Sequence, residues 1–273
     1  MTKSQKTIAL TLLILAETLL SAQLDTISIY SSIMDTTRKA IIVLPEDYFS
    51  SNKNFPVVYL LHGWSGCYKD WASHIDMRPL ADRYSFMIVS PDGGYAGWYV
   101  DSPYEEKSQF ETYIAKEVPA FIDSHYRTIK DSRGRFVCGL SMGGHGALSL
   151  MCKYPDRYSA CGSMSGVMSL DRSTKKYGIA KLLGEYEHHR SNWKRNSCIH
   201  LIENLKGKNK GIIIDCGIDD PFITGNREIH QKMLKLGIPH DYYERPGGHS
   251  WNYWTNALEY HLLFFYKRFH SSR

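Results

Sequence analysis

A serine flanked by glycines stands where an apolar run gives way to a helical pattern. The segment GLSMGG, residues 139–144, follows RFVC and precedes GHGALSLM. It matches G-x-S-x-G through Gly139, Ser141 and Gly143, a pattern in which a tight strand-to-helix turn strains the serine backbone and lifts its hydroxyl clear of the sheet. The amide of Met142 and the start of the helix then point at any anion formed there. A glycine-rich turn without chemistry is the alternative, but the strand–motif–helix context favours Ser141 as a nucleophile.

A serine hydroxyl is a poor nucleophile unless a base takes its proton. Where such a turn carries the nucleophile, the acid follows it along the chain and the histidine comes last. Among the twelve histidines, His249 lies in RPGGHSWNYW, a glycine-rich loop before the last helical pattern. His261 and His270 lie on that helix or in the tail, and His145 belongs to the helix after the serine. The chain order and the loop setting predict His249 as the base.

The acid is expected after the apolar run GIIIDCG, residues 211–217, where the sequence continues IDDPF. Asp215 falls within the run, so its side chain is expected to serve the sheet. Asp219 and Asp220 lie in the loop, where a carboxylate can accept the proton on the far nitrogen of His249, fix its tautomer and stabilise the imidazolium. Spacing alone does not separate these two aspartates.

A second donor for a developing oxyanion is expected from an early loop. The segment VVYLLHGWSG, residues 57–66, is an apolar run that ends at His62 and Gly63. In proteins with this kind of turn, the second N–H comes from the loop after an early strand. The backbone N–H of Trp64 is the expected donor, paired with that of Met142, and His62 is expected to brace the loop.

Short apolar runs alternate with helical patterns along the chain. The predicted strands are KAIIVLPEDY, FPVVYLLHG, SFMIVSPDG, RFVCGLS, SACGSMSG, KGIIIDCG and HDYYERP, and the predicted helices include QFETYIAKEVPAFIDSHY, GGHGALSLMCKY, NREIHQKMLKLG and NALEYHLLFFYKRF. This alternation predicts an α/β fold, a mostly parallel sheet flanked by helices, whose working groups collect at the carboxyl ends of the strands. Residues 165–205 are polar and helix-leaning, and we expect them to form a small cap insertion over the sheet edge.

The composition is that of an ordinary globular protein. The chain has 273 residues, of which 43% are apolar and 22% charged. The net charge of +5 comes from scattered Lys and Arg residues, which argues against a nucleic-acid partner. The six cysteines form no C-x-x-C pair and no metal-like spacing, so we expect neither a metal site nor another cofactor.

The N-terminus has the order of a secretory signal. Basic residues precede an apolar stretch from Ile8 to Leu20, and small residues follow it up to Ala22. The stretch is too short and too interrupted to span a bilayer well. We therefore expect residues 1–22 to be a signal peptide, residues 23–273 to be one domain, and the mature protein to be secreted or periplasmic without stable membrane insertion.

Six motifs together resemble a known family. YLLHGWSG, WYVDSP, ETYIAKEVPAFID, GLSMGGHGAL, CGIDDPF and GGHSWNYW, in this order, are similar to the esterase D group of α/β-hydrolases, which includes feruloyl esterases. The likeness covers roughly residues 27–268. It implies the α/β-hydrolase fold and a serine esterase with Ser141 as nucleophile and His249 as base. The family acid follows a Gly-x-x-Asp pattern, which from Gly217 lands on Asp220 rather than Asp219.

Together with the signal-like N-terminus, the resemblance implies an exported carboxylic-ester hydrolase that forms an acyl-enzyme. S-formylglutathione hydrolases of the group are cytosolic and carry a different segment where this chain has HGWSG. The signal and GLSMGG instead favour short-acyl, feruloyl or acetyl esters, with a small-molecule or carbohydrate ester as the substrate. The alternatives are an acyltransferase with the same triad, a thioesterase like the S-formylglutathione hydrolases and, less favoured, a non-catalytic binding protein on this fold.

Aromatic residues in the motif loops are candidate substrate contacts. Trp98 and Tyr99 open WYVDSP, and Trp251 follows the predicted base in GGHSWNYW. Such rings can stack on a sugar or a cinnamoyl group through apolar area and π contacts. The alternative for each ring is that it packs its own loop.

Overall fold

The apolar runs of the sequence form the strands of one sheet in the computed structural model, which describes residues 22–271. The strands are β1 (Gln23–Ser31), β2 (Thr36–Leu44), β3 (Val57–Leu61), β4 (Met87–Pro91), β5 (Arg135–Leu140), β6 (Ala160–Met164), β7 (Gly211–Gly217) and β8 (Asp241–Arg245). Apart from Ala22, the predicted signal segment lies outside the described residues.

The sheet has eight strands in the order β1-β2-β4-β3-β5-β6-β7-β8. Strands β3 to β8 pair in parallel, and β1 and β2 extend one edge with antiparallel pairing. The carboxyl ends of β3, β5, β7 and β8 therefore meet at the same edge of the sheet. These four ends precede His62, Ser141, Asp220 and His249, so the topology alone gathers the predicted site residues.

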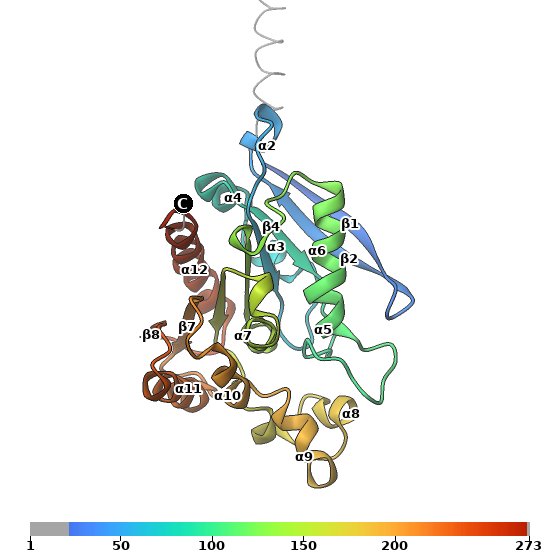
Figure 1. The fold of residues 1–273 in the computed structure, drawn as a ribbon, viewed down its shortest axis with the longest axis vertical. Helices are drawn as coiled ribbons and strands as arrows, with labels where there is room; N and C mark the ends of the chain where they lie inside the picture. The colour runs from blue at the N-terminus through green and yellow to red at the C-terminus, as the bar shows by residue number, and fades with distance from the viewer. Residues whose placement is uncertain (1–21, 272–273) are drawn as a thin grey trace, which may run out of the picture.

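Helices lie on both faces of the sheet (Figure 1). The longer ones are α4 (Arg78–Tyr84), α6 (Val118–His125), α7 (Met142–Lys153), α11 (Ile223–Leu236) and α12 (Trp251–Ser271). Shorter ones are α2 (Asp47–Ser50), α3 (Asp70–His74), α5 (Phe110–Thr112), the π-helical turn η1 (Tyr113–Glu117), and the 3-10 turns η2 (Ser132–Gly134) and η3 (Pro155–Arg157). The prediction of a mostly parallel sheet flanked by helices is confirmed.

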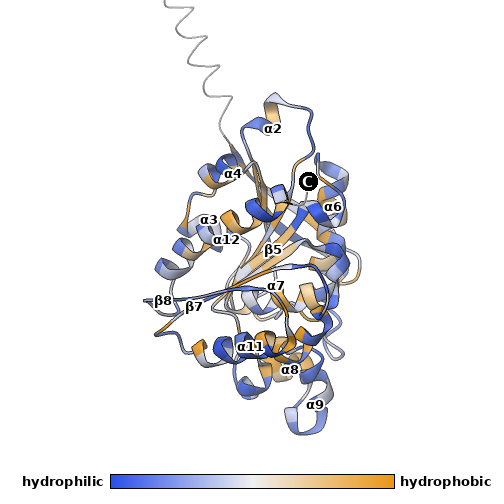
Figure 2. Ribbon diagram, turned by 60° about the vertical axis from the view of Figure 1, so that its left-hand side comes forward, coloured by the Kyte–Doolittle hydropathy of each residue, from blue (hydrophilic) through white to orange (hydrophobic). Residues whose placement is uncertain are grey.

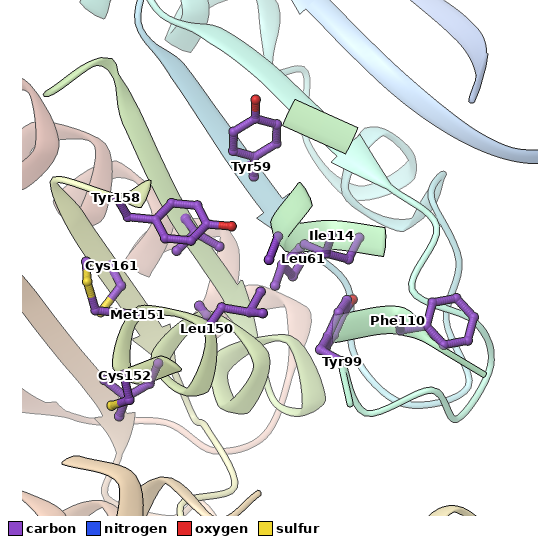
Figure 3. Packing of buried hydrophobic residues seen from close by; sticks show 14 of the residues in the cluster. Tyr59, Leu61, Tyr99, Phe110, Ile114, Leu150, Met151, Cys152, Tyr158 and Cys161 are labelled. Atoms are coloured by element: carbon purple, nitrogen blue, oxygen red, sulfur yellow. The ribbon is translucent and has the colours of Figure 1, made fainter. Parts of the chain in front are cut away.

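Alternate residues of each central strand enter two separate apolar layers. In β3, Tyr59 and Leu61 join the layer that contains the residues of α6 and α7, while Val58 and Leu60 join the layer under α3, α4 and α12. Figure 2 shows β5 as hydrophobic in the middle of the molecule, and Figure 3 shows Tyr59, Leu61 and Leu150 packed together in the first layer. Strands buried on both faces account for the continuous apolar runs of the sequence.

Helix α12 is anchored to the sheet by aromatic packing. The rings of Phe265 and Phe136 stack with centroids 5.1 Å apart, and such a pair contributes about 0.5–1.5 kcal/mol beyond its buried area. The helix begins at Trp251, two residues after His249. Packing of α12 on β5 therefore holds one end of the loop that carries the predicted base.

The segment between β6 and β7 is helical. It contains η4 (Leu170–Ser173), α8 (Ile179–Leu183), α9 (Tyr186–Lys194), α10 (Cys198–Leu201) and η5 (Ile202–Leu205). Helices α8 and α9 extend beyond the body of the molecule at the bottom of Figure 1, at the opposite end from α2. The indole N–H of Trp193 donates to the Gly184 carbonyl at 2.9 Å and holds α9 against the end of α8. We call residues 165–205 the cap.

The sequence predictions did not include β1, α2, α3 or α4. Strand β1 lies at the edge and buries few of its residues, so its sequence lacks an apolar run. Helices α3 and α4 are short, and α4 carries Pro79 in its first turn. Within the described residues no helix is long and apolar enough to cross a bilayer, and all six cysteines are free thiols.

Candidate active site

Ser141 occupies a strained turn between β5 and α7. Its backbone angles are φ 52° and ψ −115°, a left-handed conformation that non-glycine residues rarely adopt. Gly139 and Gly143, on either side of Ser141, allow this turn to approach the end of β3 closely. A Cβ at Gly143 would lie 2.4 Å from the Leu61 carbonyl oxygen, and one at Gly139 would lie 2.7 Å from the same atom. The two motif glycines are therefore required by the contact between this turn and the end of β3.

The loop after β3 lies against the Ser141 turn. A Cβ at Gly63 would stand 3.6 Å from the Ser141 Cβ, which places the backbone of this loop beside the hydroxyl. Within residues 22–271, the amides of Trp64 and Met142 donate no hydrogen bond to a protein acceptor. Amides without protein partners on two loops that touch at Gly63 and Ser141 are what an oxyanion hole requires.

His249 connects Ser141 to Asp220. Its Nδ1 lies 2.9 Å from Asp220 Oδ2, and its Nε2 lies 3.0 Å from Ser141 Oγ. Because an ionised carboxylate only accepts, the Nδ1–H donates to Asp220, which leaves the Nε2 lone pair facing the serine hydroxyl. The three side chains that the sequence separates by up to 108 positions thus form one hydrogen-bonded chain.

The loop after β7 separates the two candidate aspartates. The Asp220 side chain is buried, and its Oδ1 also accepts the Phe222 amide at 2.8 Å. Asp219 is exposed, and it contributes its backbone amide, which donates to the Gly247 carbonyl at 3.0 Å. A Cβ at Gly217 would lie only 2.2 Å from the same carbonyl oxygen, so the loops that carry acid and base touch here.

Asp215 serves the sheet, as expected from its place inside β7. It is fully buried and binds the Arg245 guanidinium and the Tyr253 hydroxyl. Burial raises the pKa of Asp215, while the Tyr253 hydroxyl and the Arg245 charge act in the opposite direction. The carboxylate is thus occupied within the protein.

His62 braces the loop after β3. Its Nε2 accepts the Gly93 amide at 2.8 Å, and its Nδ1 donates to the Gly63 carbonyl at 2.8 Å. The ring is fully buried, and both nitrogens are engaged. This contact pattern matches the bracing role that the sequence suggested.

Tyr99 is a correction to the expected substrate contacts. The Tyr99 side chain is fully buried, and its hydroxyl donates to the His62 carbonyl at 3.0 Å. Tyr99 does not line the open cleft over Ser141 and His249. A Cβ at Gly93 or Gly146 would collide with its ring, so two glycines make room for the ring beneath the loop. Figure 3 shows Tyr99 within the apolar layer. The alternative reading, that the ring packs its own loop, holds for this residue.

An open cleft of about 560 Å³ lies over Ser141 and His249. Trp98 and Trp251 line it, as do Gly63 and Trp64 of the loop after β3. The cleft is lined mainly by apolar and aromatic side chains with a few polar groups, which is usual for a site that binds a small organic molecule. Trp251 is half-buried and is placed where it can contact a substrate. Trp98 is only 1% exposed and packs against Tyr177 of the cap, which corrects its prediction as a substrate contact.

Sequence reasoning missed Tyr177, which lies in the cap and lines the cleft. Its backbone has a left-handed φ of 59°, and its carbonyl accepts the indole N–H groups of both Trp64 and Trp98, at 3.1 and 3.0 Å. These two hydrogen bonds hold the cap against the loop after β3 and against Trp98. No motif marks this position, because the carbonyl that makes the contact is common to all residues.

The ring of His249 is held between two aromatic rings. Phe222 contacts the His249 ring edge-on at 5.1 Å between centroids, and Trp254 does so at 4.7 Å. The Trp254 indole N–H donates to Ser165 Oγ at 3.1 Å, which fixes that ring in turn. This packing restricts the rotation of His249 and keeps it aligned between its two partners.

Two other histidines near the sheet are buried. Burial lowers the pKa of His145 and of His261 to about 3 in each case, and the charges of Lys153 and Arg245 respectively add to the effect. His145 Nδ1 donates to the Val167 carbonyl at 3.2 Å. Both rings are therefore neutral at neutral pH, and neither lines the cleft.

Comparisons with known proteins agree with this geometry. A family profile described as "Putative esterase" matches residues 31–265. An esterase of Mycobacterium tuberculosis is 32% identical over 235 residues, which are 76% of this chain and 51% of that protein. This chain therefore spans about half the length of that relative.

Two further relatives align over nearly their full length. An acetyl esterase of Caldicellulosiruptor saccharolyticus is 26% identical over 260 residues, covering 86% of this chain and 96% of that protein. The solved structure of a ferulic acid esterase superposes with a TM-score of 0.80 at 29% identity, covering 92% of this chain and 99% of that one. The sheet and its flanking helices thus form an α/β-hydrolase fold.

Proposed function

The chain belongs to this esterase family, and we propose that it is an exported serine hydrolase that cleaves carboxylic esters through Ser141, His249 and Asp220. The observation that carries the proposal is the hydrogen-bonded chain from Asp220 through His249 to Ser141 at the floor of an open cleft. Ester hydrolysis needs a nucleophile, a base to take its proton and an acid to orient that base.

In the proposed mechanism, His249 Nε2 takes the Ser141 proton as Oγ attacks the ester carbonyl. The carbonyl oxygen becomes an oxyanion that the Trp64 and Met142 amides stabilise. Loss of one such donor typically costs about 2.7–4 kcal/mol in turnover. Asp220 stabilises the imidazolium, and His249 then protonates the leaving alcohol. A water molecule repeats the sequence on the acyl-enzyme and releases the carboxylic acid.

The substrate class is supported by the shape and lining of the cleft. Its volume of about 560 Å³ admits a short acyl group or one aromatic acyl group together with part of the alcohol. Trp251, half-buried in the lining, offers an aromatic ring for contact with a sugar or a cinnamoyl group. Relatives named acetyl esterase and ferulic acid esterase favour short-acyl or feruloyl and acetyl carbohydrate esters. The signal-like order of residues 1–22 supports export.

The test is the substitution Ser141→Ala, assayed with p-nitrophenyl acetate and methyl ferulate. Loss of the nucleophile in such a triad can lower kcat by up to about a million-fold. Ser124→Ala, at an exposed serine on α6, is the control for an alanine substitution that leaves the site intact. Hydrolysis by Ser141→Ala near the wild-type rate contradicts the proposal.

Acyl transfer is the alternative that the same chemistry allows, because an alcohol can replace water in the second half of the reaction. Product analysis with an added sugar or alcohol acceptor separates the two. We expect the free acid to predominate, since the cleft is open to solvent. Predominant ester formation on the acceptor would instead identify an acyltransferase.

A further inference from the structure

A second hollow of about 230 Å³ shares a wall with the active-site cleft. Both spaces are lined by Val167, Tyr177, Pro221 and Phe222. Phe222 also contacts the ring of His249. The two spaces therefore adjoin, with Phe222 and Tyr177 between them, and we call the second space the side hollow.

Beside its apolar residues, the side hollow is lined by cationic and hydroxyl-bearing ones. Arg172 and Lys176 come from the cap, and they are joined by Ser173 and Thr224. Arg172 is paired with Glu228 at 2.7 Å. Lys176 is exposed and has no ion-pair partner among the residues that the structure describes. An ammonium group beside hydroxyl donors is suited to the oxygen atoms of an anion.

The charge of the active-site cleft is opposite to that of the side hollow. Asp70 contributes a carboxylate to its lining, and within residues 22–271 no lysine or arginine lines it. An anionic group on a substrate is therefore repelled from the Asp70 end and attracted toward the side hollow. The difference in charge between the two spaces gives a bound ester a preferred direction.

We propose that the side hollow binds an anionic group, a carboxylate or a phosphate, carried on the alcohol portion of the ester substrate. The inference rests on the proposed function and specifies its substrate class. The alcohol portion is chosen because the leaving oxygen must come within reach of His249, whose flank is covered by Phe222. Beyond Phe222 lies the side hollow, and Lys176 is the group that meets the anion.

The experiment compares acetate esters of phenols in matched pairs. 4-Acetoxybenzoate and 4-acetoxyphenyl phosphate carry the anion on the leaving phenol, and methyl 4-acetoxybenzoate is the neutral counterpart. Each ester is assayed with wild type, Lys176→Gln and the control Lys175→Gln, which removes the same charge from an exposed neighbour outside the hollow. Because the phenols differ as leaving groups, each variant is compared with wild type on the same ester.

We expect Lys176→Gln to lower kcat/KM about two- to fivefold for the anionic esters, the scale of one exposed ion pair. The change should appear in KM, and the neutral ester and Lys175→Gln should show no change. The anion with the larger fold-change identifies the preferred group.

Equal losses on neutral and anionic esters, or an equal effect of Lys175→Gln, would overturn the proposal. So would a loss confined to p-nitrophenyl hemisuccinate, which carries the anion on the acyl side. If wild type hydrolyses none of these esters, the proposed function fails; if it hydrolyses them without regard to Lys176, only the side hollow fails.

Discussion

Two aspartates five positions apart show how place in the fold decides what a carboxylate does. Asp215 lies inside β7 and binds Arg245 and Tyr253, while Asp220 lies in the loop beyond the strand and binds His249. Both side chains are buried, so burial does not distinguish them. The difference is that the loop turns Asp220 toward the cleft edge, where the base from the neighbouring loop meets it.

The histidines repeat the contrast. His145 and His261 lie on helices packed against the sheet and are fully buried, whereas His249 lies in the loop after β8 and is partly exposed. The buried rings are kept neutral by their surroundings, while His249 has a carboxylate on one nitrogen and a hydroxyl on the other. Chemistry is available where a strand ends, and the same residue types within the layers serve packing.

The largest effect in this comparison of strand interior and strand-end loop is a loss of kcat, which we expect from Asp220→Asn. The amide cannot accept the Nδ1–H of His249 in the same way and favours the wrong tautomer, which in such triads lowers kcat by about 10⁴. Asp219→Asn is the matched control, and it should be mild because the side chain is exposed and its contact is made by the backbone amide. Steady-state kinetics on p-nitrophenyl acetate measures both, and the reverse ranking would overturn the assignment.

A smaller effect, on stability rather than on turnover, is expected from Asp215→Asn. The substitution leaves the Arg245 charge without its partner, and breaking a buried pair in this way costs about 3 kcal/mol of unfolding free energy. Urea unfolding measures the loss, and kcat of the folded variant should change little. A variant as stable as wild type but crippled in turnover would mean that Asp215 belongs to the catalytic group.

The smallest effect concerns pH. The pKa of His145 and of His261 is about 3 in the folded protein, below the ordinary value of 6.5, so the unfolded state binds more protons between these values. Their contribution to the unfolding free energy is complete above pH 6.5 and is lost as the pH falls toward 3. The slope approaches about 1.4 kcal/mol per pH unit for each histidine.

Urea unfolding between pH 7 and pH 5 tests this linkage. His261→Leu should flatten the dependence on pH, since it removes one of the two groups. Leu263→Ala, on the exposed side of the same helix, changes no titratable group and should leave the dependence as in wild type. An unchanged slope in His261→Leu would contradict the assignment of a buried neutral ring.

The sequence predicted that Ser141, His249 and an aspartate after β7 come together, because the predicted strands place their carboxyl ends at one edge of the sheet. Apolar runs predicted β2 to β8, and parallel strands bring their carboxyl ends to one edge. Ser141 and His249 could be singled out by motif and order. Asp219 and Asp220 could not be separated by spacing, because the distinction depends on how the loop turns after Gly217.

Other features lie beyond local patterns. Tyr99 packs beneath its loop because Gly93 and Gly146, distant in sequence, leave room for its ring. The carbonyl of Tyr177 binds two indoles through a backbone atom that no side-chain pattern reveals. These contacts depend on where the cap settles against the loops, which only the three-dimensional structure shows.

The central claim, that Ser141 is the nucleophile activated by His249, is tested most directly by covalent labelling with an organophosphate. Wild-type protein is incubated with diisopropyl fluorophosphate, and the adduct is located by intact mass and peptide mapping. We expect a single adduct on the peptide that contains Ser141, none on Ser141→Ala, and much slower labelling of His249→Gln. An adduct on another serine of the cleft, such as Ser65 or Ser250, or activity that survives complete labelling of Ser141, would contradict the claim.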